Sequence, residues 1–189
     1  TLRNHQIPTG QKSHWFKIHN VIPPRKMRDT TDDSEELNSR ICNGTTVPCE
    51  IRESFIDGHS RGVGIYSINR LEPETLIWKY NVDEYSEEEA RKVLSSLTSA
   101  EEKRLWVEHV FAWRDKIVVL KDDMELINHS PEPNVYFSQK DGNIRAQNVI
   151  LSGEELLIDY RLLGSYPEFY KTMMKEVGSW YSQNFRPES

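Results

Sequence analysis

Three separated segments of this 189-residue chain carry residue types that are suited to chemistry. In Arg61-Gly62-Val63-Gly64, two glycines would let the backbone approach a ligand closely. The segment Asn128-His129-Ser130-Pro131-Glu132-Pro133-Asn134 places polar groups in a loop that two prolines stiffen. The segment Gly153-Glu154-Glu155-Leu156-Leu157-Ile158-Asp159-Tyr160 predicts a strand whose final tyrosine hydroxyl can face a cleft. Taken singly, each also has a purely structural explanation: a turn, a structural histidine, and a packing tyrosine.

In this order and spacing, the three segments resemble the SET domain of protein lysine methyltransferases. That family carries a G-x-G turn, an N-H-S-x-x-P-N loop and a G-E-E-L-x-x-D-Y strand, and the resemblance covers about residues 50–165. It implies a β-rich α+β fold, namely a SET-domain fold of several small sheets with a pseudoknot-like crossing, a helical insertion and a C-terminal helix. In such a crossing the N-H-S loop and the D-Y strand share one site.

The resemblance also implies an enzyme that moves a methyl group from S-adenosylmethionine (SAM) to a lysine side chain and leaves S-adenosylhomocysteine (SAH). The glycine turn would pass its backbone beside the methionine part of SAM. Asn128 would hydrogen-bond that part, and His129 would meet the adenine through backbone groups. The complete set of implied cofactor-binding residues is Arg61, Gly62, Val63, Gly64, Asn128, His129, Tyr160 and Trp180.

The implied catalytic residues are Tyr160, at the bottom of a lysine channel, and Tyr80, a second channel tyrosine. Aromatic residues are expected to bind the substrate: Tyr80, Phe111, Trp113, Tyr136 and Tyr166. The chain has no cysteine after Cys49, so the zinc clusters of many SET enzymes are not expected, and neither is any metal. An aromatic helix over residues 168–183 would then complete the channel or cover the adenine, through Phe169, Tyr170 or Trp180. The alternative is that this helix only caps the strands.

The elements that must position these residues are mostly short strands with β-branched and aromatic residues. Strands are predicted at 51–54, 63–67, 75–80, 111–113, 117–120, 134–137, 144–149 and 155–160. Helical periodicity appears over residues 86–109, where Ser86 and the segment Thr98–Glu102 are typical of helix N-termini. Asp141-Gly142 predicts a hairpin turn between two of the strands. The predicted domains are therefore an arm at 1–50, a SET domain at 51–165 with an insertion at about 83–110, and a helical cap at 166–189.

Charge is distributed unevenly within a formal net charge of -6. Residues 1–28 contain six basic residues and no acid, whereas residues 29–50 contain six acids and one base. The basic segment predicts contact with DNA phosphates, or else a solvated tail. Acids of the insertion could line a path for a basic peptide or form a solvated face; they are Glu87, Glu88, Glu89, Glu101 and Glu102.

Composition excludes several classes of protein. No run approaches the roughly 20 apolar residues that span a bilayer, and no signal peptide is visible, so an intracellular protein is expected. The expected partner is a protein with a basic, lysine-containing segment, and the charge layout favours a histone tail or a nucleosome. That substrate favours the nucleus, with the cytoplasm as the other possibility. A non-histone substrate and a catalytically silent SET module that binds peptides are the alternatives, and the oligomeric state is left open.

Overall fold

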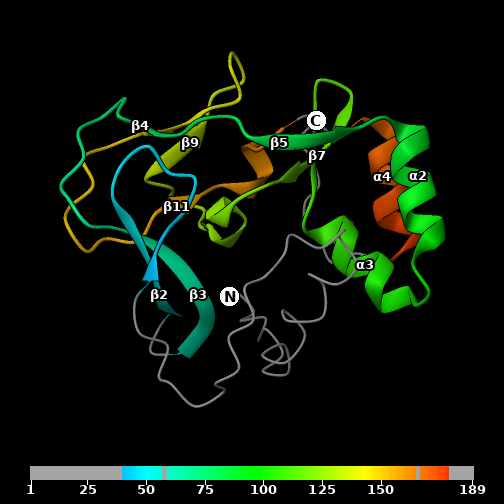
Figure 1. The fold of residues 1–189 in the computed structure, drawn as a ribbon, viewed down its shortest axis with the longest axis horizontal. Helices are drawn as coiled ribbons and strands as arrows, with labels where there is room; N and C mark the ends of the chain where they lie inside the picture. The colour runs from blue at the N-terminus through cyan, green and yellow to red at the C-terminus, as the bar shows by residue number, and fades with distance from the viewer. Residues whose placement is uncertain (1–39, 57–58, 165–166, 179–189) are drawn as a thin grey trace, which may run out of the picture. The chain divides into compact units, whose positions relative to one another are not determined.

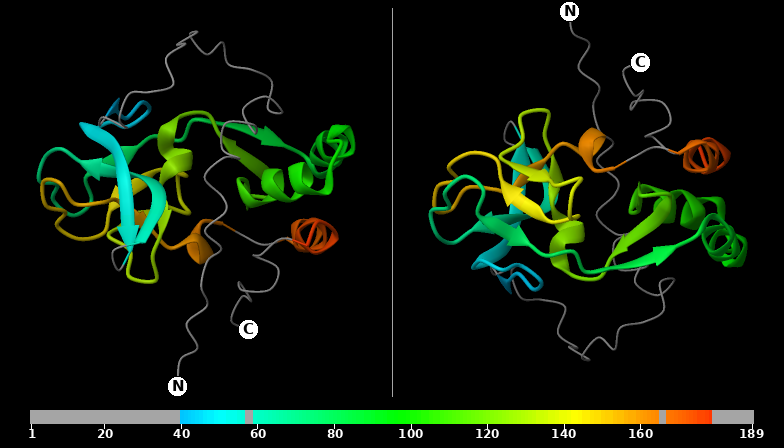
Figure 2. Two further views of the ribbon diagram at one scale, coloured as in Figure 1. Left: turned by 90° about the horizontal axis from the view of Figure 1, so that it is seen from below. Right: turned by 90° about the horizontal axis from the view of Figure 1, so that it is seen from above.

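Three small sheets form the framework of the computed structural model, which describes residues 40–56, 59–164 and 167–178. The chain divides into two units, Thr1–Asp33 and Ser34–Ser189, and all described residues belong to the second. Figure 1 shows these sheets with the helices α2, α3 and α4 gathered away from strands β2 and β3, and both views of Figure 2 show the same grouping.

The first sheet is antiparallel and has the order β1-β2-β3. Its strands are β1 (Arg40–Ile41), β2 (Cys49–Ile56) and β3 (His59–Ser67). Along β2, apolar and polar residues alternate so that Cys49 and Ile51 are buried. Cys42, just after β1, is also buried and donates its backbone N–H to Cys49 O at 2.9 Å. Within the predicted arm of residues 1–50, strand β1 and the first two residues of β2 belong to this sheet, and both cysteines enter the core.

The second sheet mixes antiparallel and parallel pairs in the order β4-β10-β9-β11-β8. Its strands are β4 (Leu76–Trp78), β8 (Asn128–His129), β9 (Val135–Phe137), β10 (Ile144–Ala146) and β11 (Leu157–Ile158). The hairpin between β9 and β10 turns at Gly142, whose φ of 75° lies in the left-handed region. The predicted Asp141-Gly142 turn is therefore confirmed. A side chain at Gly142 would also collide with the rings of Tyr80 and Trp113.

The third sheet, of order β5-β7-β6, carries the helical insertion between two of its strands. Its strands are β5 (Val82–Tyr85), β6 (Phe111–Trp113) and β7 (Lys116–Leu120), and the inserted helices are α2 (Glu87–Ser96) and α3 (Ala100–Glu108). Ser86 and Ser99 each form a complete capping box with the glutamate three residues later, Glu89 and Glu102. The predicted helix starts are confirmed.

The C-terminal helix is shorter than the sequence predicts. Helix α4 (Glu168–Glu176) ends before Gly178, whose φ of 64° is left-handed and whose N–H donates to Lys175 O. A glycine in this conformation is a common helix stop, so the expectation of one helix to residue 183 is wrong. None of the helices in the described ranges has the length and apolar composition that a membrane span requires.

One hydrophobic core joins the first two sheets. Fully buried side chains from both sheets meet there, among them Ile65, Trp78, Val135 and Ile158. Two short 3-10 helices flank this core, η2 (Asp123–Leu126) between β7 and β8 and η3 (Tyr160–Leu162) between β11 and α4. The observed β-rich α+β fold with several small sheets matches the expected fold class.

Candidate functional site

Two parallel strands of only two residues each bring two distant motifs together. In the β8–β11 pair, Leu157 lies opposite Asn128 and Ile158 lies opposite His129. The loop after β8 continues the pairing, because Ser130 N donates to Ile158 O at 3.0 Å. The loop after β8 and strand β11 are separated by more than twenty residues in the sequence but lie side by side in the structure. We call this arrangement the β8–β11 crossing.

Asn134 ties the far end of this loop to the same strand. Its side-chain oxygen accepts from Leu157 N at 2.8 Å, and its side-chain nitrogen donates to Glu155 O at 2.7 Å. Its backbone N–H also donates to Leu157 O at 3.0 Å. An amide side chain offers both a donor and an acceptor, which a carboxylate or a hydrocarbon cannot do. The asparagine therefore holds the loop against the strand where a longer ladder of backbone hydrogen bonds is absent.

The segment Gly62–Gly64, predicted as a turn, instead lies within strand β3, where Gly62 pairs with Ser54 and Gly64 with Arg52 of β2. This segment, for which we keep the name glycine turn, lies against the β8–β11 crossing, and its two glycines are needed for different reasons. Gly62 has a φ of 101°, and the space where a Cβ would stand is open. At Gly64 a Cβ would overlap Glu155 Oε1 and come within 2.9 Å of Asn128 Nδ2. Asn128 Nδ2 donates to Val63 O at 3.0 Å and to Glu155 Oε1 at 2.7 Å. The turn, the loop and the strand thus meet at Asn128.

Tyr160 lies two residues after β11, at the start of η3, and contacts His129. Its N–H donates to His129 Nδ1 at 3.2 Å, and its ring lies 5.2 Å from the imidazole, centroid to centroid. Its hydroxyl donates to Ile127 O. Because His129 Nδ1 accepts a hydrogen bond, it carries no proton in this arrangement, and any proton on the neutral ring is on Nε2. The half-buried Tyr160 is therefore held at both its backbone and its hydroxyl.

Asp159, beside Tyr160, is buried and paired with an arginine. Arg161 Nη2 lies 2.6 Å from Asp159 Oδ2, and Arg161 N donates to Asp159 Oδ1 at 3.0 Å. Burial by itself would raise the pKa of the Asp159 carboxyl, but the hydrogen bonds and charge of Arg161 hold that pKa below its ordinary value. Asp159 is therefore an ionised structural anchor rather than a proton carrier at neutral pH.

Four aromatic rings, from Tyr80, Phe111, Trp113 and Phe137, form a cluster. The Trp113 ring contacts Tyr80 at 4.8 Å and Phe137 at 5.4 Å between centroids, and Phe137 also meets Phe111 at 5.5 Å. The Tyr80 hydroxyl donates to Glu84 Oε1 at 2.9 Å. Burial raises the pKa of the Tyr80 phenol, and its hydrogen bond to Glu84 raises it further. Tyr80 is thus a neutral, half-buried phenol in an apolar wall.

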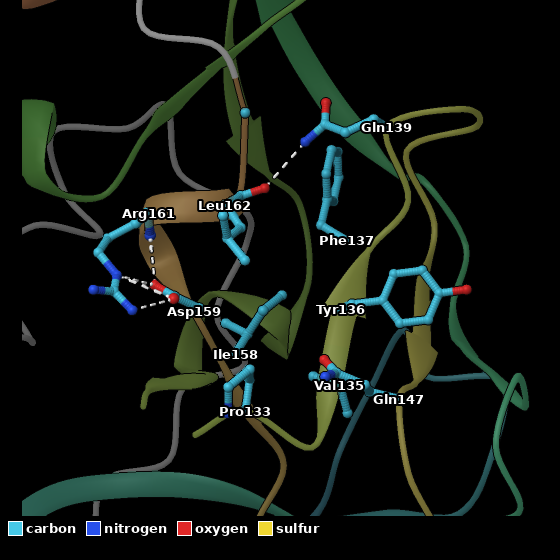
Figure 3. A pocket seen from close by; sticks show the side chains of 11 residues that line it. Pro133, Val135, Tyr136, Phe137, Gln139, Gln147, Ile158, Asp159, Arg161 and Leu162 are labelled. Carbon is cyan, nitrogen blue, oxygen red and sulfur yellow. Dashed lines mark hydrogen bonds and ion pairs between the residues drawn. The ribbon is translucent and has the colours of Figure 1, made fainter. Parts of the chain in front are cut away.

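A pocket of about 450 Å³ opens beside β9 and β11. Figure 3 shows Phe137, Leu162 and Ile158 around it, with Gln139 donating to Leu162 O at 3.0 Å across its upper end. Its lining residues are Pro133, Val135, Tyr136, Phe137, Gln139, Gln147, Ile158, Asp159, Arg161, Leu162 and Gly164. Through Phe137 the pocket touches the aromatic cluster, and Asp159 connects it to Tyr160 in the chain. Its lining does not include Val63, Gly64, Asn128 or Glu155.

Comparisons with known proteins decide the family. The family model of the SET domain matches residues 62–161, which is more than half of the chain. This chain belongs to the SET-domain family. The matched range contains the glycine turn, both strands of the β8–β11 pair and Tyr160, so the geometry above is that of a SET domain. Members of this family are in general SAM-dependent lysine methyltransferases.

Solved structures show weaker likeness. The Neurospora SET domain protein DIM-5, a histone lysine methyltransferase, is 23% identical with a TM-score of 0.49, and the match covers 62% of this chain and 53% of that one. A humanised mutant of the Chaetomium thermophilum Polycomb Repressive Complex 2 is 17% identical with a TM-score of 0.42, and the match covers 60% of this chain and 15% of that one. The chain thus spans about half the length of the DIM-5 chain. No curated protein matched the sequence.

The SET-domain structure brings some of the expected site residues together and separates others. Val63, Gly64, Asn128 and His129 form one group with Tyr160. Tyr80, Phe111 and Trp113 form the aromatic cluster, and Tyr136 lies in the pocket with its hydroxyl donated to Glu74 Oε2 at 2.8 Å. Arg61 lies in β3, but its side chain, Tyr166 and Trp180 are outside the described residues.

The helical cap has a packing role at one expected position. The Tyr170 hydroxyl, on α4, donates to Val110 O at 2.6 Å and lies 3.2 Å from Val107 O. Tyr170 therefore fastens α4 to the end of α3 and is not available to cover a cofactor. The acids of the insertion are also engaged locally: Glu87 and Glu88 pair with Arg91 and Lys92, and Glu89 and Glu102 complete the capping boxes.

Two SET-domain residues near the site had no assigned role in the sequence analysis. Phe137 joins the aromatic cluster to the pocket, and the alternation of β9 between Val135 and Phe137 was the available signal for burial. Glu155 accepts from Asn128 and fills the space beside Gly64, and its place inside the G-E-E motif was the available signal. In both cases the partner lies far away in the sequence.

The residues around Asn128 fit the cofactor that the family uses. Both hydrogens of the Asn128 amide are directed to Val63 O and Glu155 Oε1, so its side-chain oxygen is left as the group that can accept from an ammonium. The backbone at Gly62 borders open space, and the rings of His129 and Tyr160 supply flat apolar faces. Within the described ranges, no three potential metal-ligating side chains gather.

Proposed function

We propose that this SET domain is a SAM-dependent protein-lysine N-methyltransferase. One observation carries the proposal: the parallel β8–β11 pair sets Asn128 and His129 directly beside Tyr160 and against the glycine turn. Residues from three separated motifs thus converge, and their roles would be complementary. The Asn128 oxygen would accept from a cation, the rings of His129 and Tyr160 would offer flat apolar faces, and the Tyr160 hydroxyl would contact the lysine amine. A fold that used these motifs only for packing would not require that combination.

SAM, when bound, supplies a methyl group on a sulfonium centre that a lysine nitrogen can attack. The lysine must be neutral, although its ordinary pKa is about 10.4. A poorly solvated wall formed by Tyr80, Trp113 and Phe137 would lower that pKa, because burial disfavours the ammonium. The site therefore has no need of a strong general base.

Tyr160 would orient the amine. Its hydroxyl donates to Ile127 O, and a phenol oxygen can accept as well as donate, so it would accept an N–H of the incoming lysine. Accepting that N–H turns the nitrogen lone pair away from Tyr160 and toward the methyl group. Such positioning can account for roughly 7–11 kcal/mol of a barrier between two reactants.

The test is methyl transfer from labelled SAM to free histones, nucleosomes and proteins of a cell extract. We expect label in a protein band, and Tyr160→Phe should abolish it or change the number of methyl groups per lysine. Tyr85→Phe is the matched control, because this half-buried tyrosine of β5 packs on Trp106 and the substitution should leave the rate unchanged. Unchanged rate and product in Tyr160→Phe would remove Tyr160 from the site. SAM binding without any transfer would favour the silent peptide-binding module instead.

We further propose a histone tail as the substrate and a nuclear location. The support is the acidic balance of the chain, with a formal net charge of -6, and the basic segment 1–28, which lies outside the described residues. This segment would contact nucleosomal DNA, so its deletion should weaken nucleosome binding and flatten the salt dependence. Label only in extract proteins would point to a non-histone substrate, and unaltered binding after deletion would rule out the DNA contact.

A further inference from the structure

A carboxylate lies behind the proposed cofactor site and gathers hydrogen bonds from three segments. Glu155 accepts from Ser54 Oγ at 2.8 and 2.9 Å, from Tyr66 OH at 3.2 Å and from Asn128 Nδ2 at 2.7 Å. Ser54 is fully buried, and Tyr66 is stacked under Arg52 with the guanidinium 4.2 Å from its ring. Residues of the first sheet therefore fix the position of the Glu155 carboxylate, and the carboxylate in turn fixes the orientation of the Asn128 side chain.

We propose that Glu155 is the positioning residue that turns the Asn128 side-chain oxygen toward the ammonium group of the methionine part of SAM. This inference rests on the proposed function. An asparagine amide can be reversed at little cost unless its neighbours distinguish nitrogen from oxygen. Here the carboxylate of Glu155 and the carbonyl of Val63 are both acceptors, so only the NH₂ group can face them. The oxygen must then face the opposite side.

The contact with Glu155 also makes Asn128 a better acceptor. A hydrogen bond to an ionised group is roughly twice as strong as one between neutral groups. It polarises the amide and increases the negative character of the oxygen at the other end. The remaining negative charge of Glu155 acts in the same direction on a cation nearby. Glu155 therefore assists binding of the ammonium without touching it.

Gly64 shows how closely the carboxylate approaches the turn. A Cβ at this position would overlap Glu155 Oε1, so the carboxylate occupies the volume that any other residue would fill. Gly64 is buried and its φ is not in the left-handed region, so the requirement for glycine here comes from Glu155 and not from backbone conformation. The turn and Glu155 are thus matched in shape as well as in hydrogen bonding.

The experiment compares two ligands in calorimetric titrations. SAH carries the amino-acid part, whereas 5′-methylthioadenosine lacks it and keeps the adenosine and sulfur. In Glu155→Ala we expect SAH to bind about tenfold more weakly, which corresponds to one lost charge-assisted hydrogen bond. Binding of 5′-methylthioadenosine should be unchanged. Glu155→Gln should keep SAH affinity within about threefold, because its amide oxygen can still accept from Asn128.

Controls separate positioning from a general loss of structure. Glu53→Ala removes an exposed carboxylate from the neighbouring strand and should alter neither affinity. If Glu155→Ala does not fold, Glu155→Asp keeps the charge but withdraws it from Asn128, and should weaken SAH several-fold without affecting 5′-methylthioadenosine. Equal weakening of both ligands, or none, would overturn the inference. If the unmodified protein binds no SAH, the proposed function itself fails, whereas methyl transfer that survives Glu155→Ala with full SAH affinity defeats only the role of Glu155.

Discussion

The β8–β11 crossing and the helical insertion are stabilised in opposite ways. Each strand of the crossing has two residues, and side chains such as Asn134 and Asn128 complete its hydrogen bonding over long sequence separations. Helices α2 and α3 satisfy their own ends through capping boxes and carry ion pairs between residues four apart. One region depends on particular residues from distant segments, and the other on local patterns that many sequences can supply.

This difference teaches where substitutions should be costly. In the crossing, removal of one side chain leaves distant backbone groups unpaired and moves the candidate site. In the insertion, removal of one side chain weakens a helix end and leaves the site where it was. We therefore expect effects on both stability and ligand binding in the crossing, and on stability alone in the helices.

Asn134→Ala should have the largest effect on stability. It leaves Leu157 N and Glu155 O without their side-chain partners, which should lower the free energy of unfolding by about 3 kcal/mol. Urea unfolding followed by tryptophan fluorescence would measure the loss. Asn148→Ala, at an exposed asparagine, is the control and should be nearly neutral. A loss in Asn134→Ala no larger than in this control would show that the crossing does not depend on the clamp.

Substitutions at the two turn glycines should separate backbone strain from site geometry. Gly62→Ala should cost about 2 kcal/mol of stability, because alanine is strained at a φ of 101° although the space is open. Gly64→Ala should instead weaken SAH binding, because its methyl group displaces the Glu155 carboxylate. Adding Glu155→Ala to Gly64→Ala should then cost little more affinity, since both act on the same contact. Additive losses in the double variant would contradict this coupling.

Loss of a helix cap should have a smaller effect that is confined to stability. Ser86→Ala and Ser99→Ala should each lower the free energy of unfolding by about 1 kcal/mol, because each removes the acceptor for a backbone N–H of the first turn. Lys92→Ala, which breaks only an exposed ion pair with Glu88, should cost less than about 0.5 kcal/mol. SAH affinity should be unaltered in all three variants, and a clear loss in any of them would mean that the insertion supports the site.

The smallest effect is expected from pH at Asp159. Because the pKa of this carboxyl is lowered in the folded protein, its ionised form stabilises the fold at neutral pH, and that contribution is lost as the pH falls through the folded pKa. The stability difference between the unmodified protein and Asp159→Asn should therefore shrink as the pH falls below about 4, near the ordinary value for aspartate. Thermal unfolding at a series of pH values would measure it. A constant difference down to strongly acidic pH would contradict the assignment.

Local features of this protein were predictable from sequence because their partners lie within a few residues. The capping boxes of Ser86 and Ser99 and the turn at Gly142 each depend on a segment of about four residues. The three motifs also identified the family, since residue identities at the crossing carry the fold. The predicted cofactor and substrate roles of individual residues stay predictions.

Tertiary structure alone decided which distant side chains meet. Asn128 lies 65 residues from Val63 and 27 from Glu155, and no pattern in either segment states that the amide bridges both. Burial of Cys42 and Cys49 likewise depends on the pairing of β1 with β2. The polar residues around these cysteines gave no sign of this pairing, so the sequence predicted an arm there. The physical reason is that hydrogen-bond direction and excluded volume, such as the overlap at Gly64, exist only once the chain has brought separate segments into contact.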